Sequence, residues 1–204
     1  MLKSSLCIAF FAFAVGCAPA QKPLTDYVNP MLGTATLWDS VDLGFKPTKR
    51  TWGAEVFPGS SLPNAMVQVS PVTKFHSGAG YQYEDSVIYG FTHTNKGHWN
   101  LCHIPLLPVT GTPTPGDYCS PFSHERESAA PGYYQVFLDR YGVDAQLSST
   151  LRCAFHKYTY PAGAAASLLA DLQRSNEHVR AWDIRKEGDN VFAGWQQTGE
   201  KMYF

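Results

Sequence analysis

Polar and aromatic side chains suited to hydroxyl recognition gather in one short segment of the chain. Between Phe91 and Leu101 the sequence offers several hydrogen-bonding groups beside an indole ring: His93, Thr94, Asn95, Lys96, His98, Trp99 and Asn100. Directional hydrogen bonds distinguish sugar epimers, and an aromatic plane covers the apolar C–H face of a pyranose ring. The competing interpretation is structural, with Trp99 closing one end of a sandwich and the histidines bonding loop backbone.

Other kinds of site find less support. His93, His98 and His103 are five residues apart, whereas the helical zincin motif spaces its histidines by four. The sequence has no G-x-S-x-G elbow, no CxxC pair and no phosphate-binding glycine loop. A glycosidase needs two carboxyl groups across the scissile bond. The acids in apolar or loop contexts form no such pair: Asp39, Asp42, Glu55, Glu84 and Asp85. We therefore expect no catalytic residue and no metal site in this chain.

The elements that must position these side chains are short strands. After a loop-rich stretch over 33–64, runs rich in Val, Ile, Tyr, Phe and Thr alternate with turns that contain Pro and Gly. The runs cover 65–70, 86–93, 104–110, 133–138, 143–150, 151–160, 167–171, 181–186 and 190–195. Many strands separated by about 8–12 residues predict an all-β fold, an antiparallel β-sandwich with long loops at one end.

Three local features refine this prediction. In the run 151–160, Leu151, Cys153 and Phe155 fall on one face of the strand. Residues 162–170 have some helix propensity, which Gly163 and the short span weaken. Residues 187–190, Glu-Gly-Asp-Asn, predict a hairpin turn.

We interpret residues 1–20 as an export leader. Lys3 supplies a positive charge, and Leu6–Val15 is an apolar run too short to span a bilayer. Residues 14–17, Ala-Val-Gly-Cys, resemble a lipobox, which would make Cys17 the lipidated amino terminus; a competing cleavage site follows Ala20. Either site predicts an exported bacterial protein, periplasmic or anchored to the outer membrane as a lipoprotein.

Charge and cysteine content exclude further classes. Lys and Arg number 16 against 17 Asp and Glu, with no basic stripe, so nucleic acid is not an expected partner. Beyond the leader and Cys17, the cysteines are Cys102, Cys119 and Cys153. An odd number leaves at least one free thiol, and pairing of Cys102 with Cys119 stays open.

Three segments resemble, in order and spacing, the amino-terminal domain of the glycoside hydrolase family 92 α-mannosidases. They are FPGSSLPNAMVQVSP at 57–71, SGAGYQYEDSVIYGFTHT at 77–94 and LPVTGT at 107–112. The resemblance implies a galactose-mutarotase-like supersandwich over 21–204, packed on a larger (α/α)-barrel domain. It also implies a calcium-dependent, inverting exo-α-mannosidase acting on α-mannosides of N-glycans or mannan. The catalytic acids and Ca²⁺ ligands of such an enzyme belong to the second domain, which this chain lacks.

The resemblance also implies a set of substrate-binding residues. The aromatic-Pro-Gly turn contributes Phe57, Gly59 and Ser60, and a GFSHT-like segment contributes His93. To these the polar segment 93–100, which we call the polar loop, adds Asn95, His98 and Trp99. The sequence departs from the family pattern at 95–100 and at 74–76, where the sugar of the leaving group would sit, so the preference for α-1,2 linkages stays open.

The sequence is therefore compatible with three functions. The first is the non-catalytic sandwich of an α-mannosidase, truncated after the apolar run 201–204 and inactive without its catalytic domain. The second is a stand-alone carbohydrate-binding lipoprotein whose platform is Trp99 with the loop around His93. The third is a structural lipoprotein, or an unproductive gene product, with no ligand.

Overall fold

Two antiparallel sheets form the body of the protein. The computed structural model describes residues 21–36, 56–96, 99–114, 116–199 and 201–204. One sheet has five strands in the order β1 (Ser60–Ser61), β2 (Gln68–Val72), β4 (Gly90–Thr92), β7 (Leu106–Thr110) and β13 (Ala166–Ala170). The other has four in the order β12 (Ala154–Thr159), β11 (Val143–Ser149), β10 (Tyr133–Leu138) and β9 (Glu127–Ala130). This arrangement confirms the predicted all-β sandwich.

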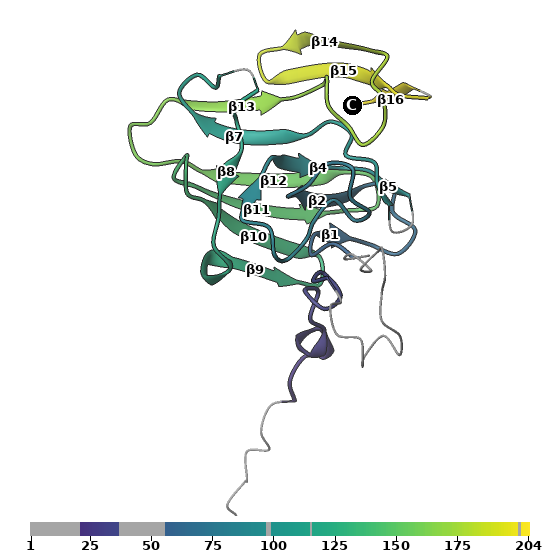
Figure 1. The fold of residues 1–204 in the computed structure, drawn as a ribbon, viewed down its shortest axis with the longest axis vertical. Coiled ribbons are helices and arrows are strands. Elements are labelled where there is room, and N and C mark those ends of the chain that lie inside the picture. Colours follow the sequence, from purple (N-terminus) through teal and green to yellow (C-terminus); the bar gives the residue numbers. More distant parts are fainter. Residues whose placement is uncertain (1–20, 37–55, 97–98, 115, 200) are drawn as a thin grey trace, which may run out of the picture.

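A third sheet lies beside β7 and β13, at the top of Figure 1. Its strands are β14 (Ala181–Gly188), β15 (Val191–Gln197) and β16 (Lys201–Tyr203). Two short ribbons complete the strands: β3 (Val87–Ile88) with β8 (Ser120–Pro121), and β5 (Asn95–Lys96) with β6 (Trp99–Asn100). The described helices are two 3₁₀ turns, η1 (Leu24–Tyr27) and η2 (His124–Arg126). Within the described residues, no helix is long and apolar enough to cross a membrane.

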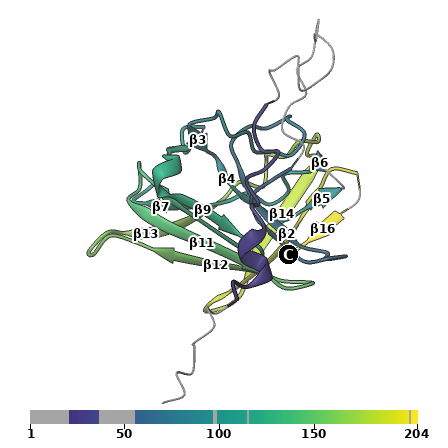
Figure 2. The ribbon, with the colours of Figure 1, turned by 90° about the horizontal axis from the view of Figure 1, so that it is seen from below.

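The core lies between the five- and four-stranded sheets. Along β10 and β11 every second residue is buried, as period-2 alternation requires: Tyr134, Val136, Leu138, Val143, Ala145 and Leu147. Phe91, Leu107 and Val109 of the facing sheet belong to the same cluster. Figure 2 shows the strands of both sheets from below. Because each sheet covers the apolar face of the other, the ends of the sandwich are left to carry loops.

Most predicted runs became strands, but several bounds changed. The run 133–138 matches β10, and β14 and β15 form a hairpin whose turn at 189–190 lies within the predicted 187–190. The run 86–93 is divided between β3 and β4. β12 begins only at Ala154, and its inner face carries His156 and Tyr158, whereas Leu151 and Phe155 are 52% and 60% exposed. The apolar face predicted for this run is therefore the outer one.

Residues 162–170 are not helical. A turn around Gly163, whose φ of 75° favours glycine, leads into β13. β13 then pairs antiparallel with β7, from Ala166 opposite Thr110 to Ala170 opposite Leu106. Sheet pairing outweighs the helix propensity of the alanines here. Cys102, Cys119 and Cys153 are all free thiols, so the question of a Cys102–Cys119 disulfide is answered in the negative.

Candidate functional site

The predicted turn at 57–61 is fixed against its neighbouring strands. β1 pairs with β2, and Ser60 lies opposite Val69. A Cβ atom on Gly59 would lie 2.0 Å from the carbonyl oxygen of Val69, so only glycine fits there. Ser60 is fully buried, and its hydroxyl is 2.7 Å from that of Ser149 in β11. Phe57 is half-buried. The turn is thus rigid, and its role in substrate binding stays a prediction.

The side chain of His93 contacts the opposite sheet. Its Nε2 lies 2.9 Å from Nε2 of His156 in β12, and Nδ1 of His156 lies 2.7 Å from the Tyr158 hydroxyl. Burial lowers the pKa of His93 to about 4 and that of His156 to about 3, so both imidazoles are neutral near pH 7. Phe91 stacks on Tyr158 at a centroid distance of 6.3 Å. This ladder of side chains locks the start of the polar loop to the sandwich.

Trp99 is the first residue of β6 and remains accessible. β5 and β6 pair as a short hairpin, with Asn95 opposite Asn100 and Lys96 opposite Trp99. The Trp99 residue is 48% exposed. It therefore offers an aromatic surface to a ligand. His98 and Cys17, two other predicted site residues, lie outside the described residues.

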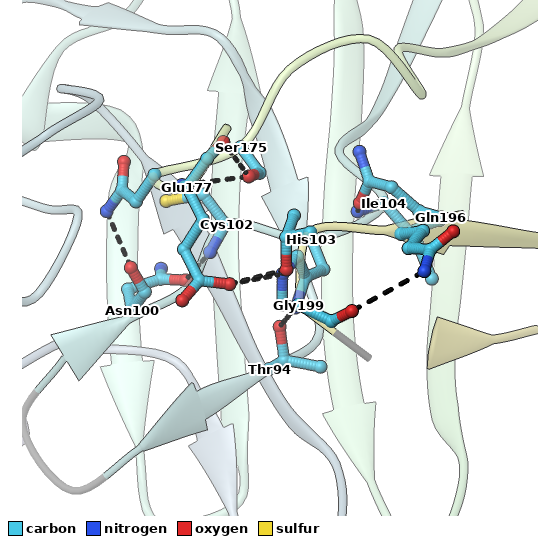
Figure 3. A network of polar contacts seen from close by, with 12 residues as sticks. Thr94, Asn100, Cys102, His103, Ile104, Ser175, Glu177, Gln196 and Gly199 are labelled. Carbon is cyan, nitrogen blue, oxygen red and sulfur yellow. Dashed lines mark hydrogen bonds and ion pairs between the residues drawn. The ribbon is translucent and has the colours of Figure 1, made fainter. Parts of the chain in front are cut away.

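The loop returns to the sheet through a strained and buried tripeptide. Cys102 and Ile104 have φ values of 53° and 52°, and both residues are buried. A β-branched residue in this region is a conformational outlier that its surroundings must hold in place. The Cys102 N–H donates to the Asn100 side chain at 2.8 Å, and the Ile104 N–H donates to Gln196 Oε1 at 3.1 Å. Figure 3 shows these residues meeting from separate elements.

Gln196 in β15 satisfies three backbone groups at once. Besides accepting from Ile104, it donates through Nε2 to the carbonyls of Leu172, at 2.9 Å, and Arg174, at 3.1 Å. The side chain is fully buried. Such a side chain is expensive to remove, because each backbone group that it releases would be left unsatisfied. Gln196 therefore clamps the strained tripeptide to the 172–174 segment.

His103, between the two strained residues, is bonded on both ring nitrogens. Nδ1 lies 3.0 Å from the Thr94 hydroxyl, and Nε2 lies 3.2 Å from the Thr198 hydroxyl. Glu177 Oε2 is 3.4 Å from Nε2 and accepts from Thr198 at 2.5 Å (Figure 3). Burial lowers the pKa of His103, and the half-exposed Glu177 opposes that shift. The strained backbone and its hydrogen bonds to Gln196 together fix the end of the loop, where it returns to the sheet.

Asn100 and Gly80 fix the other side of the loop. Asn100 exchanges side-chain hydrogen bonds with Thr92 at 3.1 Å, and its carbonyl accepts from Asn176 at 2.5 Å. A Cβ atom on Gly80, where φ is 76°, would lie 2.6 Å from Asn100 Nδ2. Both the left-handed backbone and this close approach require glycine at position 80.

Glu127 is a buried acid that the sequence did not single out. It lies in β9 with a side chain only 2% exposed. The hydroxyls of Tyr81 and Tyr134 donate to Oε1 at 2.9 and 2.6 Å, and Nδ1 of His124 lies 2.5 Å from Oε2. Burial, together with Glu127, raises the pKa of both tyrosines. His124 and Tyr134 are near neighbours in sequence, but Tyr81 lies 46 residues away, so no local motif identifies this site.

The described acids form no metal centre. Across the described ranges, no group of three or more His, Cys, Asp or Glu side chains could hold a metal ion. Two of the acids considered above have other partners: Glu84 accepts from the Thr36 N–H at 2.7 Å, and Asp85 accepts from Thr73 at 2.7 Å. Asp39, Asp42 and Glu55 lie outside the described residues. The geometry suits recognition of a polar ligand by a preorganised loop.

Comparison with known proteins places this geometry in a family. The sequence profile of the glycosyl hydrolase family 92 N-terminal domain matches residues 27–204. No curated protein sequence is similar enough to match the chain. Two solved structures of a family GH92 α-mannosidase from Bacteroides thetaiotaomicron, one of them in complex with mannoimidazole, superpose with a TM-score of 0.73 at 29% identity. They match 86% of this chain and only 24% and 23% of theirs.

Two further structures extend the comparison. The GH92 family glycosyl hydrolase ccman5 matches with a TM-score of 0.67 at 26% identity, over 88% of this chain and 25% of its own. An inverting GH92 mannosidase from Bacteroides thetaiotaomicron VPI-5482, at 24% identity and a TM-score of 0.68, shares the fold. The chain thus spans about a quarter of the length of these relatives. It belongs to glycosyl hydrolase family 92, and residues 27–204 correspond to the N-terminal domain of that family.

Proposed function

We propose that this chain is the carbohydrate-contacting sandwich of an exported, calcium-dependent, inverting exo-α-mannosidase that degrades mannose-containing glycans. The observation that carries the proposal is the family match over 27–204, joined to the complex of one relative with mannoimidazole. The polar loop supports it, because Trp99 is accessible while the backbone behind it is clamped by Gln196. In this proposal the loop borders the sugar and the chemistry takes place elsewhere.

Calcium and proton transfer are assigned to polypeptide beyond this chain. An inverting glycosidase places an acid and a base about 6.5–9.5 Å apart across the scissile bond. The described residues offer no group of three or more His, Cys, Asp or Glu side chains around which a metal site could be built. Glu127, the buried acid, is enclosed by Tyr81, Tyr134 and His124 and cannot meet a substrate. We therefore propose no catalytic step through any residue of this chain.

The proposal is tested on a longer polypeptide in which this chain is joined to the remaining segments of a family 92 enzyme. Trp99→Ala should lower kcat/KM for an α-mannobiose by about tenfold, which corresponds to about 1.4 kcal/mol of lost transition-state stabilisation. Trp195→Ala is the matched control: Trp195 lies in β15 under the Lys201 ammonium and outside the polar loop. Equal kinetics for Trp99→Ala and the unsubstituted protein would remove the loop from the substrate site.

A stand-alone carbohydrate-binding lipoprotein is the second function considered, and the exposed indole of Trp99 is the observation that favours it. The two functions differ in what the isolated chain does at the polar loop. Half of an active-site pocket should bind mannose or mannobiose too weakly to measure. A complete binding platform would give a saturable signal that Trp99→Ala abolishes. Isothermal titration of the chain and this variant separates the two.

A further inference from the structure

A groove with a volume of about 610 Å³ lies between the end of β13 and the face of β14. This volume falls within the roughly 300–1,000 Å³ typical of small-ligand sites. Six residues that line it combine apolar, aromatic and charged side chains: Tyr118, Leu169, Asp171, Arg174, Trp182 and Ile184. None of the residues predicted to bind substrate is among them.

The polar side of the groove is held in place by its own contacts. The Tyr118 hydroxyl donates to Asp171 Oδ2 and accepts from Arg174 Nη1 at 3.2 Å. Asp171 Oδ1 also accepts the Gln173 N–H at 3.1 Å. The Arg174 guanidinium lies over the rings of Phe75, at 4.4 Å from the centroid, and Tyr89, at 5.1 Å. A carboxylate and a guanidinium are thus fixed on either side of one phenol.

The apolar side presents an indole to solvent. Trp182 and Ile184 are two residues apart on β14, so they share one face, which Asp183 and Arg185 do not. Both line the groove, and they are 42% and 38% exposed. Packing of a hydrophobic core would not leave the indole exposed, and an ion pair would not need an indole beside it. The combination of an accessible indole with a fixed carboxylate and guanidinium therefore suits a ligand site.

We propose that this groove binds a neutral hexopyranose ring at a second site, separate from the polar loop. The indole of Trp182 would cover the C–H face of the sugar, while Asp171 accepts from one hydroxyl and Arg174 donates to its neighbour. The opposite charges of Asp171 and Arg174 cancel, so the groove favours an uncharged polyol over an anion or a cation. The inference goes beyond the proposed active-site role, because it needs no catalytic domain.

The test is a titration of the purified chain followed by ¹H–¹⁵N NMR, with methyl α-mannoside, α-1,2-mannobiose and maltose as separate probes. We expect saturable shifts at the amides of 169–174 and 182–184, with a dissociation constant in the millimolar range. The mannosides and the glucoside show whether the groove prefers one epimer. Absence of saturable shifts with all three sugars overturns the proposal.

Two substitutions assign the binding to the groove. Trp182→Leu and Asp171→Asn should each weaken binding at least tenfold, while the spectrum keeps its folded dispersion. Trp195→Leu is the matched control, because Trp195 pairs with Asp183 and so lies on the opposite face of the sheet from Trp182. Shifts that survive in Trp182→Leu contradict the proposal.

The same titration on the longer polypeptide tests whether protein fills the groove. Binding should persist there, and its loss would mean that the groove is a packing surface for other polypeptide, which overturns the proposal. Failure of this inference is distinguishable from failure of the proposed function. The groove is read by NMR shifts that require no turnover, whereas the mannosidase role is read by hydrolysis and by Trp99→Ala.

Discussion

Side chains alternate between two faces both in the closed sandwich and in the sheet β14–β16, but the large apolar side chains are buried in the first and exposed in the second. In the closed sandwich, the five- and four-stranded sheets bury Phe91, Tyr134 and Leu147 almost completely. In the sheet β14–β16, the face that buries Gln196 also carries Trp182, 42% exposed, and Phe192, 59% exposed. This face is covered at one end only. Alternation therefore tells which side chains share a face, but not what covers it.

The largest difference between the two regions should appear in matched phenylalanines. Phe91→Ala opens a cavity in the closed core and should lower the free energy of unfolding by about 3–5 kcal/mol. Phe192→Ala removes a ring that is already 59% exposed, and its cost should stay below about 1 kcal/mol. Chemical denaturation of both variants measures the contrast. Similar losses would show that the sheet β14–β16 is as well covered as the sandwich.

Buried and exposed acids should differ in the same way. Glu127→Ala leaves the hydroxyls of Tyr81 and Tyr134 without their acceptor and should cost about 3 kcal/mol. Glu187→Ala, in the sheet β14–β16, breaks a 2.7 Å ion pair with Arg185 at the surface and should change stability by about 0.5 kcal/mol or less. Urea unfolding at pH 7 compares the two variants. A neutral Glu127→Ala would refute the structural role given to this acid.

Gln196, which joins the sheet β14–β16 to the strained tripeptide 102–104, should contribute to stability as a core side chain does. Gln196→Leu keeps the volume but abandons the Ile104 N–H and two carbonyls, and should cost about 2 kcal/mol. Hydrogen exchange across 99–106 should accelerate in the same variant. Gln197→Leu, on the opposite face of β15, is the control and should leave that exchange unchanged. Unaltered protection in Gln196→Leu would mean that the strained tripeptide needs no clamp.

The buried pair His93 and His156, which we call the histidine ladder, makes the stability of the closed sandwich depend on pH. Burial lowers the pKa values of His93 and His156 from 6.5 to about 4 and about 3, so below pH 6.5 the unfolded chain binds protons that the folded one does not. The free energy of unfolding should therefore decrease as the pH falls from 6.5 toward 4, by at most about 1.4 kcal/mol per pH unit for each histidine.

Denaturant midpoints between pH 7 and pH 4 measure this slope. His156→Gln should flatten it by removing one titrating imidazole from the ladder. His178→Gln, at an exposed position, should leave it unchanged. A slope that is the same in all three proteins would show that the ladder does not couple protonation to folding.

Local sequence was enough to predict the sandwich, because runs rich in Val, Ile, Tyr, Phe and Thr, such as 133–138 and 143–150, and the turns between them are properties of each segment alone. Motif spacing likewise led to the family and to the neighbourhood of His93 and Trp99. The contacts that shape the loop were not predictable, because Ile104 meets Gln196 across 92 positions. Glu127 was missed for the same reason, since Tyr81 lies 46 residues away. The prediction for 151–160 was misleading because the outer face of β12 carries the exposed Phe155, while Leu151 precedes the strand and is exposed as well.

Release of mannose is the most direct test of the central claim, that this chain borders a sugar site and leaves the chemistry to other polypeptide. The purified chain and the longer polypeptide should be incubated side by side with α-1,2-mannobiose, with calcium and with a chelator. We predict no release by the chain in either condition, and calcium-dependent release by the longer polypeptide. Sustained release of mannose by the 204-residue chain alone would contradict the account.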